Sequence, residues 1–187
     1  MRTYKLTIAY DGTRYQGWQR QANTDRTIQG ILERAISEQA GYPVEIDGSG
    51  RTDAGVHASG QTASVVLSGI TSENFFTEKI NRDPPEDIRI LVADLVKNGF
   101  HARKSAFGKV YEYRIDTGTK PDVFQRRYCF HFPHKLDLDI MRRAAEKLKG
   151  THEFAGYTDK KDEKSTKRTI YDIIVSGQGS SVTIRYE

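Results

Sequence analysis

The sequence has a single cysteine, Cys129, which rules out a disulfide within the chain. It also lacks any run of about 18 apolar residues, so no typical membrane-spanning helix is predicted. Residues 1–5 do not form the apolar core of a signal peptide. Together with a mean hydropathy of −0.67, these absences lead us to expect a soluble, cytoplasmic protein.

Metal-binding patterns are also missing from the sequence. Among the five histidines, only His131 and His134 are closely spaced, and neither cysteines nor clustered carboxylates accompany them. We therefore interpret both histidines as structural or exposed side chains and expect no bound metal.

Basic residues are concentrated in one part of the chain. Residues 103–127 carry seven basic and three acidic residues, which accounts for the whole net charge of +4. The same segment contains the aromatic residues Phe107, Tyr111, Tyr113 and Phe124, and Tyr128 follows it directly. This mixture favours a nucleic-acid surface, because cations bind phosphates and rings stack on bases. A solvated strand with ordinary core aromatics is the alternative interpretation.

The first half of the chain predicts the order β-α-β-β-α-β. Strands are expected at 3–10, 44–47, 62–67 and 88–95, and a second helix at 72–81. The first helix is indicated by apolar residues with helical spacing from Ile28 to Ile36. Asp25 is a possible cap for it, and Gly41 is its expected terminator. This order is the split βαβ pattern of ferredoxin-like folds, in which one face of the sheet is open for a ligand.

The second half predicts a shorter β-α-β-β order. A strand is expected at 109–116, with Tyr111 and Tyr113 on one face, and a hairpin at 169–176 and 182–186. Between them, a helix is expected from the cap Asp137 to Lys149, with Gly150 as its stop. The apolar stripe of that helix comprises Ile140, Met141, Ala144, Ala145 and Leu148.

Two polar segments of the chain allow either an RNA contact or a purely structural role. Residues 159–168 are highly charged and predict an exposed loop or, alternatively, a phosphate contact. The loop after the first strand carries Arg14, Trp18 and Arg20, which have the chemistry to reach RNA. Equally, the Trp18 ring is suited to fold back onto the core.

The stretch from Gly48 to Gln61 places four glycines around one acidic residue. Arg51 and Asp53 are two residues apart, so an extended backbone puts the guanidinium beside the carboxylate. A carboxylate held in this way can act as a nucleophile, a general base or an electrostatic stabiliser. A turn with a structural ion pair is the alternative. A phosphate-binding loop is not predicted, because no Lys-Ser/Thr pair or helix follows.

Several motifs, taken in order along the chain, resemble those of the tRNA pseudouridine synthases of the TruA type. The longest is Gly50-Arg51-Thr52-Asp53-Ala54-Gly55-Val56-His57-Ala58. Others are Tyr10-Asp11-Gly12, Gly17-Trp18-Gln19-Arg20-Gln21, Thr27-Ile28-Gln29, Phe100-His101-Ala102-Arg103 and Lys109-Val110-Tyr111-Glu112-Tyr113-Arg114. The resemblance runs from about residue 4 to the end of the chain.

The resemblance implies isomerisation of uridine to pseudouridine in the tRNA anticodon arm, at positions 38, 39 or 40, without a cofactor. In such an enzyme Asp53 is the catalytic carboxylate, Arg51 orients it, and Tyr111 lines the uracil pocket. Periodicity alone does not distinguish Tyr111 from Tyr113. The RNA-contacting residues implied are Arg14, Trp18, Arg20, Arg103, Lys109 and Arg114.

The implied architecture is an α+β protein with two ferredoxin-like (RRM-like) halves, antiparallel sheets and a cleft between the halves. We expect an N-terminal domain at 1–103 with the aspartate loop and a C-terminal domain at 104–187 with the tyrosine. Members of the family are homodimers, and they normally continue into a further C-terminal helix. The second half is therefore expected to be incomplete, with part of its apolar sheet uncovered.

Two alternatives to an active tRNA enzyme follow from these observations. The first is a catalytically impaired tRNA-binding module of the same family. The second is a pseudouridine synthase that acts on another RNA. Isomerase assays on anticodon arms and on unrelated hairpins distinguish all three.

Overall fold

The computed structural model describes all residues except 71, 73 and 159–164. The chain divides into two compact units, Met1–Phe107 and Gly108–Glu187, which we describe separately. Most of the charged segment predicted as an exposed loop at 159–168 lies outside the described residues. None of the helices in the described part of the chain is long and apolar enough to cross a membrane.

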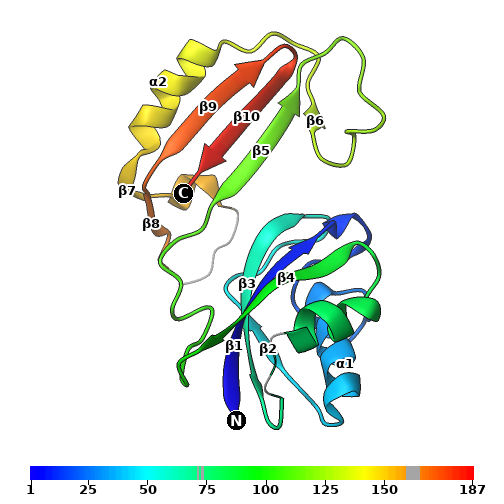
Figure 1. Cartoon of the computed structure of the whole chain (residues 1–187). Coiled ribbons are helices and arrows are strands. Elements are labelled where there is room, and N and C mark those ends of the chain that lie inside the picture. Colours follow the sequence, from blue (N-terminus) through cyan, green and yellow to red (C-terminus); the bar gives the residue numbers. More distant parts are fainter. Residues whose placement is uncertain (71, 73, 159–164) are drawn as a thin grey trace. The chain divides into compact units, whose positions relative to one another are not determined.

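The N-terminal unit is built on a four-stranded antiparallel sheet with the order β2-β3-β1-β4 (Figure 1). The strands are β1 (Arg2–Tyr10), β2 (Ile46–Gly48), β3 (Ala58–Leu67) and β4 (Ile88–Val96). All four predicted strands are therefore present, although β3 begins four residues before its predicted start. Alternation along β1 buries Tyr4, Leu6, Ile8 and Tyr10 on one face, as expected from the sequence.

Helix α1 (Ile28–Ala40) covers this buried face. Its N-terminal cap is Thr27, whose hydroxyl accepts a hydrogen bond from the Gly30 N–H, so the prediction of Asp25 as cap is wrong. At the other end, Gly41 has φ +78°, a left-handed conformation that suits glycine and ends the helix as predicted.

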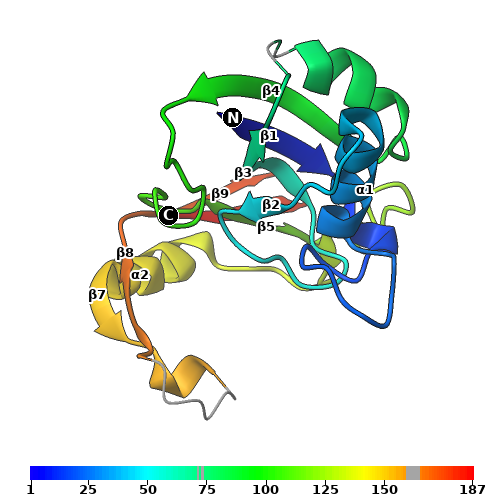
Figure 2. The same cartoon turned by 90° about the horizontal axis from the view of Figure 1, so that it is seen from below.

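The helix predicted at 72–81 has an irregular form. It consists of the π-helical turn η2 (Phe75–Lys79) followed by the 3-10 turn η3 (Ile80–Arg82). Phe75, Phe76 and Ile80 join the same core as α1, and Figures 1 and 2 show both helical segments on the same side of the sheet. The sequence therefore predicted a helical segment here, but it did not predict the π-helical and 3-10 hydrogen-bonding patterns.

The C-terminal unit contains a four-stranded mixed sheet with the order β6-β5-β10-β9. Its strands are β5 (Tyr111–Asp116), β6 (Phe130–His131), β9 (Ile173–Gln178) and β10 (Ser181–Tyr186). The pair β9–β10 is the predicted hairpin, and Gln178 pairs with Ser181 at its turn. The short strand β6, which pairs in parallel with β5, was not predicted.

The predicted strand at 169–176 is interrupted, and this part of the prediction is wrong. Strand β8 (Lys167–Ile170) pairs with β7 (Gly150–Glu153) in a separate two-stranded sheet, and β9 begins only at Ile173. Gly150, predicted to stop the preceding helix, has φ +98° and is the first residue of β7.

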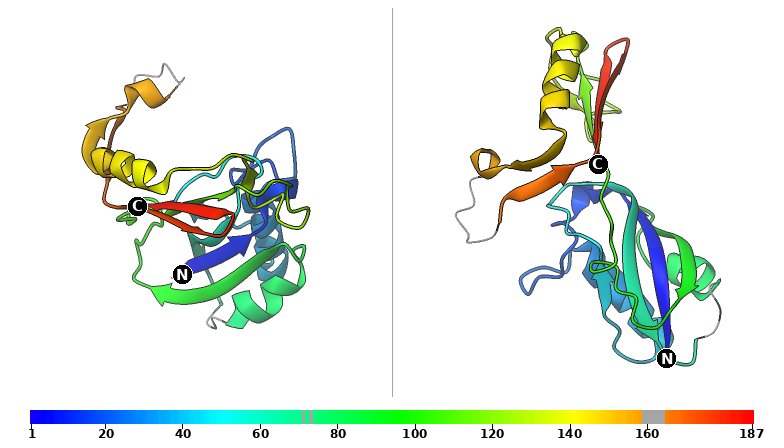
Figure 3. Two further views of the ribbon diagram at one scale, coloured as in Figure 1. Left: turned by 90° about the horizontal axis from the view of Figure 1, so that it is seen from above. Right: turned by 90° about the vertical axis from the view of Figure 1, so that its left-hand side faces the viewer.

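Helix α2 (Leu138–Leu148) packs on one face of the four-stranded sheet of the C-terminal unit. Figure 3 shows this sheet nearly edge-on in its right-hand view. Asp137 caps it as predicted, because its carboxylate accepts from the N–H groups of Asp139 and Ile140, both at 3.0 Å. The predicted apolar stripe is partly wrong. Ile140 is 56% exposed, whereas the residues from α2 in the small core are Leu138, Met141 and Ala145.

Candidate active site

The loop that carries Asp53 connects β2 to β3 and spans residues 49–57. Its neighbour in space is the segment 11–18, which follows β1 and includes the 3-10 turn η1 (Gly12–Arg14). The Trp18 N–H donates to the Thr52 carbonyl oxygen at 3.0 Å, and the Gly55 N–H donates to the Tyr15 carbonyl oxygen at 3.2 Å. These two bonds attach the backbone to segment 11–18 on both sides of Asp53.

A side-chain contact from the end of β1 supports the same loop. The Tyr10 hydroxyl lies 2.9 Å from the hydroxyl of Thr52 and forms a hydrogen bond with it. Burial raises the pKa of the Tyr10 phenol, and the hydrogen bond to Thr52 partly offsets this effect. Because Tyr10 is buried in the core, it fixes Thr52 relative to the sheet.

Glycines allow the close approach of the two segments. Gly17 has φ +88°, and a β-carbon placed there would lie 2.5 Å from the Thr52 carbonyl oxygen. At Gly12, a β-carbon would collide with the carbonyl oxygen of Val56. A side chain at either position is therefore incompatible with the observed packing.

Trp18 is 2% exposed and belongs to the core of the N-terminal unit. Its indole lies against Gly48, where a β-carbon would come within 2.6 Å of the ring. Of the two interpretations of Trp18 from the sequence, this burial favours core packing over contact with RNA.

The Arg51 and Asp53 side chains are both exposed but do not pair. The residues that the structure describes include both, and no hydrogen bond or ion pair joins the guanidinium to the carboxylate. The sequence-based expectation of such a pair is therefore wrong. It assumed a regular extended strand, whereas residues 51–57 form an irregular loop with a turn closed by the Val56 N–H and the Asp53 carbonyl oxygen at 3.2 Å.

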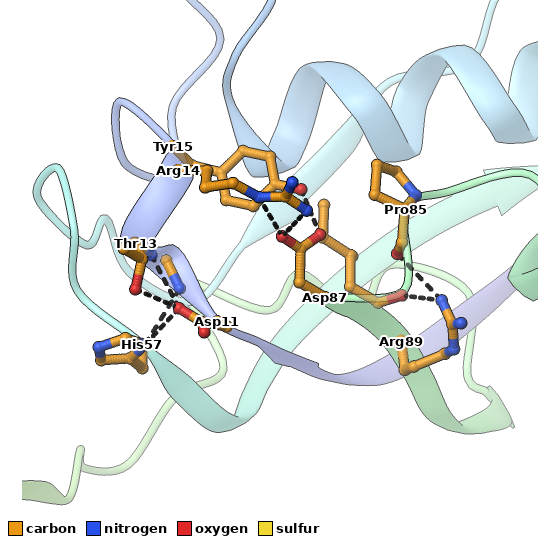
Figure 4. Close-up of polar contacts among 10 residues, drawn as sticks. Asp11, Thr13, Arg14, Tyr15, His57, Pro85, Asp87 and Arg89 are labelled. Atoms are coloured by element: carbon orange, nitrogen blue, oxygen red, sulfur yellow. Dashed lines mark hydrogen bonds and ion pairs between the residues drawn. The ribbon is translucent and has the colours of Figure 1, made fainter. Parts of the chain in front are cut away.

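His57, at the end of the loop, contacts the start of segment 11–18 (Figure 4). Its Nδ1 lies 3.0 Å from Asp11 Oδ1 and 3.2 Å from the backbone nitrogen of Gly12. A single ring nitrogen cannot serve both partners at once. When unprotonated it accepts from the Gly12 N–H, and when protonated it donates to the Asp11 carboxylate.

Asp87 forms a second polar cluster behind segment 11–18 (Figure 4). Its carboxylate accepts hydrogen bonds from the Arg14 guanidinium, at 3.0 and 2.7 Å, and from the Tyr15 hydroxyl, at 2.5 Å. Sequence analysis identified neither Asp87 nor the contact of His57 with Asp11. No spacing pattern links residues so far apart in the chain.

The predicted RNA-contacting cations differ in their surroundings. Arg14 is paired with Asp87, while Arg20 Nη1 lies 3.0 Å from Glu33 Oε2, and Arg114 Nε lies 2.6 Å from Glu112 Oε1. Among the described residues, Arg103 and Lys109 form no ion pair. Arg103 follows Ala102, which is buried and donates its N–H to the Ser64 hydroxyl on β3 at 3.0 Å.

Tyr111 in the C-terminal unit is 44% exposed and stacks on Tyr186 of the neighbouring strand. The ring centroids are 5.3 Å apart, with an interplanar angle of 21°. Burial raises the pKa of the Tyr186 phenol, and its proximity to Tyr111 adds to the effect. Tyr113 is 51% exposed and approaches Phe130, so both candidate tyrosines remain accessible.

The two histidines considered in the metal analysis have other partners in the structure. His131 Nδ1 lies 3.2 Å from Asp116 Oδ2, and the His134 ring packs edge-on against Phe132. Among the described residues, no group of three or more histidine, cysteine and carboxylate side chains is placed to hold a metal ion.

Comparison with known proteins gives a consistent result. Residues 6–103 match the family model described as tRNA pseudouridine synthase. The chain is 42% identical over 186 residues to a protein of Bacillus sp. (strain KSM-64) named tRNA pseudouridine synthase A, covering 99% of this chain and 76% of that protein. A protein of the same name from Lacticaseibacillus casei is 43% identical over 177 residues, covering 94% of this chain and 71% of the relative.

Proposed function

Since this chain belongs to the tRNA pseudouridine synthase family of the TruA type, we propose that it converts uridine to pseudouridine in the anticodon arm of tRNA. In this proposal Asp53 is the catalytic carboxylate. The observation that supports it most directly is the attachment of the Asp53 loop to segment 11–18 on both sides of that residue. A reacting group needs such a fixed backbone because small displacements cost much of the rate.

The proposed reaction is an isomerisation that consumes no co-reactant. The bond from the ribose C1′ to N1 of uracil breaks, the base turns, and a bond from C1′ to C5 forms. The proton leaves C5, and N1 ends protonated, so atoms and electrons balance without a cofactor. Asp53 is exposed and therefore accessible to a nucleotide taken out of its stem.

Arg51 and Tyr111 have supporting roles in this proposal. Arg51 forms no hydrogen bond or ion pair with Asp53 among the described residues, so its proposed role is to occupy the space of the extruded base or to orient Asp53 once RNA is bound. Tyr111 presents a partly exposed ring and hydroxyl, which suits packing on uracil and proton transfer at C5.

The proposal extends to the fold and the partners of the protein. The strand order β2-β3-β1-β4 with helical segments on one face supports a ferredoxin-like N-terminal half, and β5, β9 and β10 with α2 support a shorter related half. We propose tRNA as the substrate, bound through phosphates by Arg103 and Lys109, with Arg114 available once released from Glu112. A cytoplasmic location and a homodimer are further parts of this proposal.

Replacing Asp53 by Asn tests the proposal. We expect pseudouridine formation in an anticodon-arm RNA to fall to background, with tRNA affinity within about threefold of the unmodified chain, because the change removes one charge from an exposed loop. Asp94→Asn is a matched control, since Asp94 has a half-exposed carboxylate that pairs with Lys5 on β1. Turnover by the Asp53→Asn chain at the normal rate would contradict the assignment.

The same assay separates the two alternatives. Binding of tRNA by the unmodified chain without any isomerisation would indicate a binding module. Turnover on unrelated hairpins, but not on anticodon arms, would indicate another RNA substrate.

A further inference from the structure

Asp87 lies immediately before β4 and is the centre of a hydrogen-bonded cluster (Figure 4). Its Oδ2 accepts from Nε and Nη2 of Arg14, at 3.0 and 2.7 Å, and its Oδ1 accepts from the Tyr15 hydroxyl at 2.5 Å. The carboxylate side chain is 16% exposed, so water screens these contacts only partly. The proposed reaction assigns no chemical role to Asp87, Arg14 or Tyr15.

Tyr15 connects this cluster to the Asp53 loop. Its side chain is 6% exposed and is held by Asp87, while its carbonyl oxygen accepts the N–H of Gly55 at 3.2 Å. Gly55 is two residues beyond Asp53 and adopts φ +79° in the turn closed by Asp53 and Val56. The Asp87 carboxylate and the turn are therefore separated by a single residue.

The backbone of Asp87 provides a second connection to the loop. Its carbonyl oxygen accepts the Asp11 N–H at 2.9 Å. The Asp11 side chain in turn lies 3.0 Å from Nδ1 of His57, which ends the same loop. Through Tyr15 and Asp11, Asp87 thus supports two separate points of the loop on the C-terminal side of Asp53.

We propose that Asp87 is a positioning residue for the reaction, acting through Tyr15 to fix the turn that presents Asp53. The proposal rests on the function proposed for Asp53. In this role Arg14 balances the charge of Asp87 and holds the carboxylate toward Tyr15. Arg14 is then part of the support for the loop instead of a phosphate contact.

The Tyr15 hydroxyl is suited to this role over the working pH range. Burial raises the pKa of its phenol, and the hydrogen bond to Asp87 raises it further. The hydroxyl therefore stays protonated and continues to donate to the carboxylate at neutral and mildly alkaline pH. A neutral donor to a charged acceptor forms one of the stronger classes of hydrogen bond in proteins.

Asp87→Ala and Tyr15→Phe test the proposal from both ends of the contact. We expect kcat to fall about 10- to 100-fold in both, with KM and tRNA affinity changed by less than about threefold, because only the placement of Asp53 is disturbed. Tyr15→Phe keeps the buried ring and loses only the hydroxyl. Asp87→Asn retains an acceptor for Tyr15 and is expected to recover part of the lost kcat.

The double variant Tyr15→Phe/Asp87→Ala provides a sharper criterion. Since both substitutions remove the same contact, we expect its kcat to be no lower than that of Asp87→Ala alone. Multiplication of the two single effects would overturn the proposed coupling. Arg14→Gln is expected to lower kcat with little change in tRNA affinity. A lower affinity with normal kcat would instead make Arg14 a phosphate contact and contradict its supporting role.

Amide hydrogen exchange at Gly55 tests the contact without any assay of activity. We expect faster exchange at this N–H in Asp87→Ala and Tyr15→Phe, because the Tyr15 carbonyl that protects it is less firmly held. Glu86→Gln is the matched control, since it removes a neighbouring exposed charge and is expected to alter neither exchange nor kcat. Unchanged exchange and unchanged kcat in Asp87→Ala would overturn the proposal.

The two proposals fail in different ways. If Asp53→Asn retains activity, the assignment of Asp53 is lost, yet exchange at Gly55 still reports whether Asp87 holds the turn. If Asp53→Asn is inactive while Asp87→Ala has normal kcat and normal exchange, only the role of Asp87 is lost.

Discussion

A methyl group on Gly17 would lie 2.5 Å from the carbonyl oxygen of Thr52, the residue before Asp53. That oxygen already accepts a hydrogen bond from the Trp18 N–H at 3.0 Å. The backbone that carries the proposed catalytic carboxylate is therefore attached to segment 11–18, and the absence of a side chain at Gly17 is what makes this contact possible.

Gly17→Ala is predicted to lower activity more than stability alone explains. The substitution places a β-carbon at φ +88° and pushes the Thr52 carbonyl away from Trp18. We expect a loss of pseudouridine formation of at least about 10-fold per folded molecule, measured by single-turnover kinetics. Gly41→Ala is the control, because Gly41 also has a positive φ but has nothing within 4 Å of its added β-carbon. Equal activity losses in both variants would contradict the prediction.

Glu33→Ala is predicted to destabilise the N-terminal unit. Glu33 is 4% exposed, and its Oε1 accepts from the Ile46 N–H at 3.0 Å, which joins α1 to β2. Removing the acceptor leaves a buried N–H without a partner, so we expect the free energy of unfolding to fall by about 1–3 kcal/mol. Denaturant titration measures this loss.

Two further variants show which part of Glu33 matters. Glu33→Gln keeps an oxygen that can accept from the Ile46 N–H but removes the negative charge that faces Arg20. In the structure Arg20 Nη1 lies 3.0 Å from Glu33 Oε2, although the two atoms are not aligned for a hydrogen bond. We expect it to be less destabilising than Glu33→Ala. Glu38→Ala, on the exposed side of the same helix, is expected to change the free energy by at most about 0.5 kcal/mol.

Arg103→Ala and Lys109→Ala are predicted to weaken tRNA binding and its dependence on salt. Neither cation is paired in the described structure, so each is available to a phosphate. Each substitution is expected to reduce the slope of log affinity against log salt by about one. Arg20→Ala is the comparison, because Arg20 already faces Glu33 and Glu45. A slope reduced equally by Arg20→Ala would show that its carboxylate partners release it to RNA.

The C-terminal unit is predicted to lose stability as the pH falls below the ordinary aspartate range. The Ile140 N–H lowers the pKa of Asp137, and the side chain of Lys149 lowers that of Asp172. Between the folded-state and unfolded-state pKa values the unfolded chain binds more protons, so stability rises with pH there. The contribution is therefore present above about pH 4 and is lost at lower pH as the folded-state carboxylates protonate.

Asp137→Asn isolates one of these groups. Asparagine also caps helices well but does not titrate, so the helix is retained while its dependence on pH decreases. Thermal melts followed by circular dichroism between pH 2 and pH 7 measure the effect. A melting curve with the same dependence on pH as the unmodified chain would contradict the prediction.

Local pattern predicted most of the fold because strand alternation and helix termini depend on neighbouring residues. Tyr4 to Tyr10, the cap Asp137 and the terminator Gly41 all follow from such short-range rules. The misses arise from tertiary packing. Ile140 fits a helical apolar stripe, yet α2 turns Leu138 and Met141 toward β9 and β10 instead.

The interruption near Tyr171 also depends on contacts distant in sequence. Its N–H donates to the carbonyl oxygen of Glu187 at 2.7 Å, and the Glu187 N–H donates to the Asp172 carbonyl oxygen at 3.0 Å. The backbone here separates from the direction of β8 to run beside β10, and no local propensity indicates such a break.

The sequence predicted only those parts of the candidate site that belong to a local motif. The loop bearing Asp53 was found from its glycines, and its relation to a family was found from the Arg51-Thr52-Asp53 run. The supporting residues were missed because Asp87 and Tyr15 are 72 residues apart, and periodicity describes only neighbours along the chain. The expected Arg51–Asp53 pair failed for the converse reason, since closeness in sequence does not ensure contact within an irregular loop.

Trp18 is the only tryptophan of the protein. Its indole lies against Gly48, the last residue of β2 before the Asp53 loop, and its backbone N–H donates to the Thr52 carbonyl oxygen. Ultraviolet emission excited at wavelengths that tyrosine does not absorb therefore originates from one ring at the base of this loop. The intrinsic fluorescence of Trp18 therefore reports on the backbone beside the proposed catalytic residue, and no dye needs to be attached.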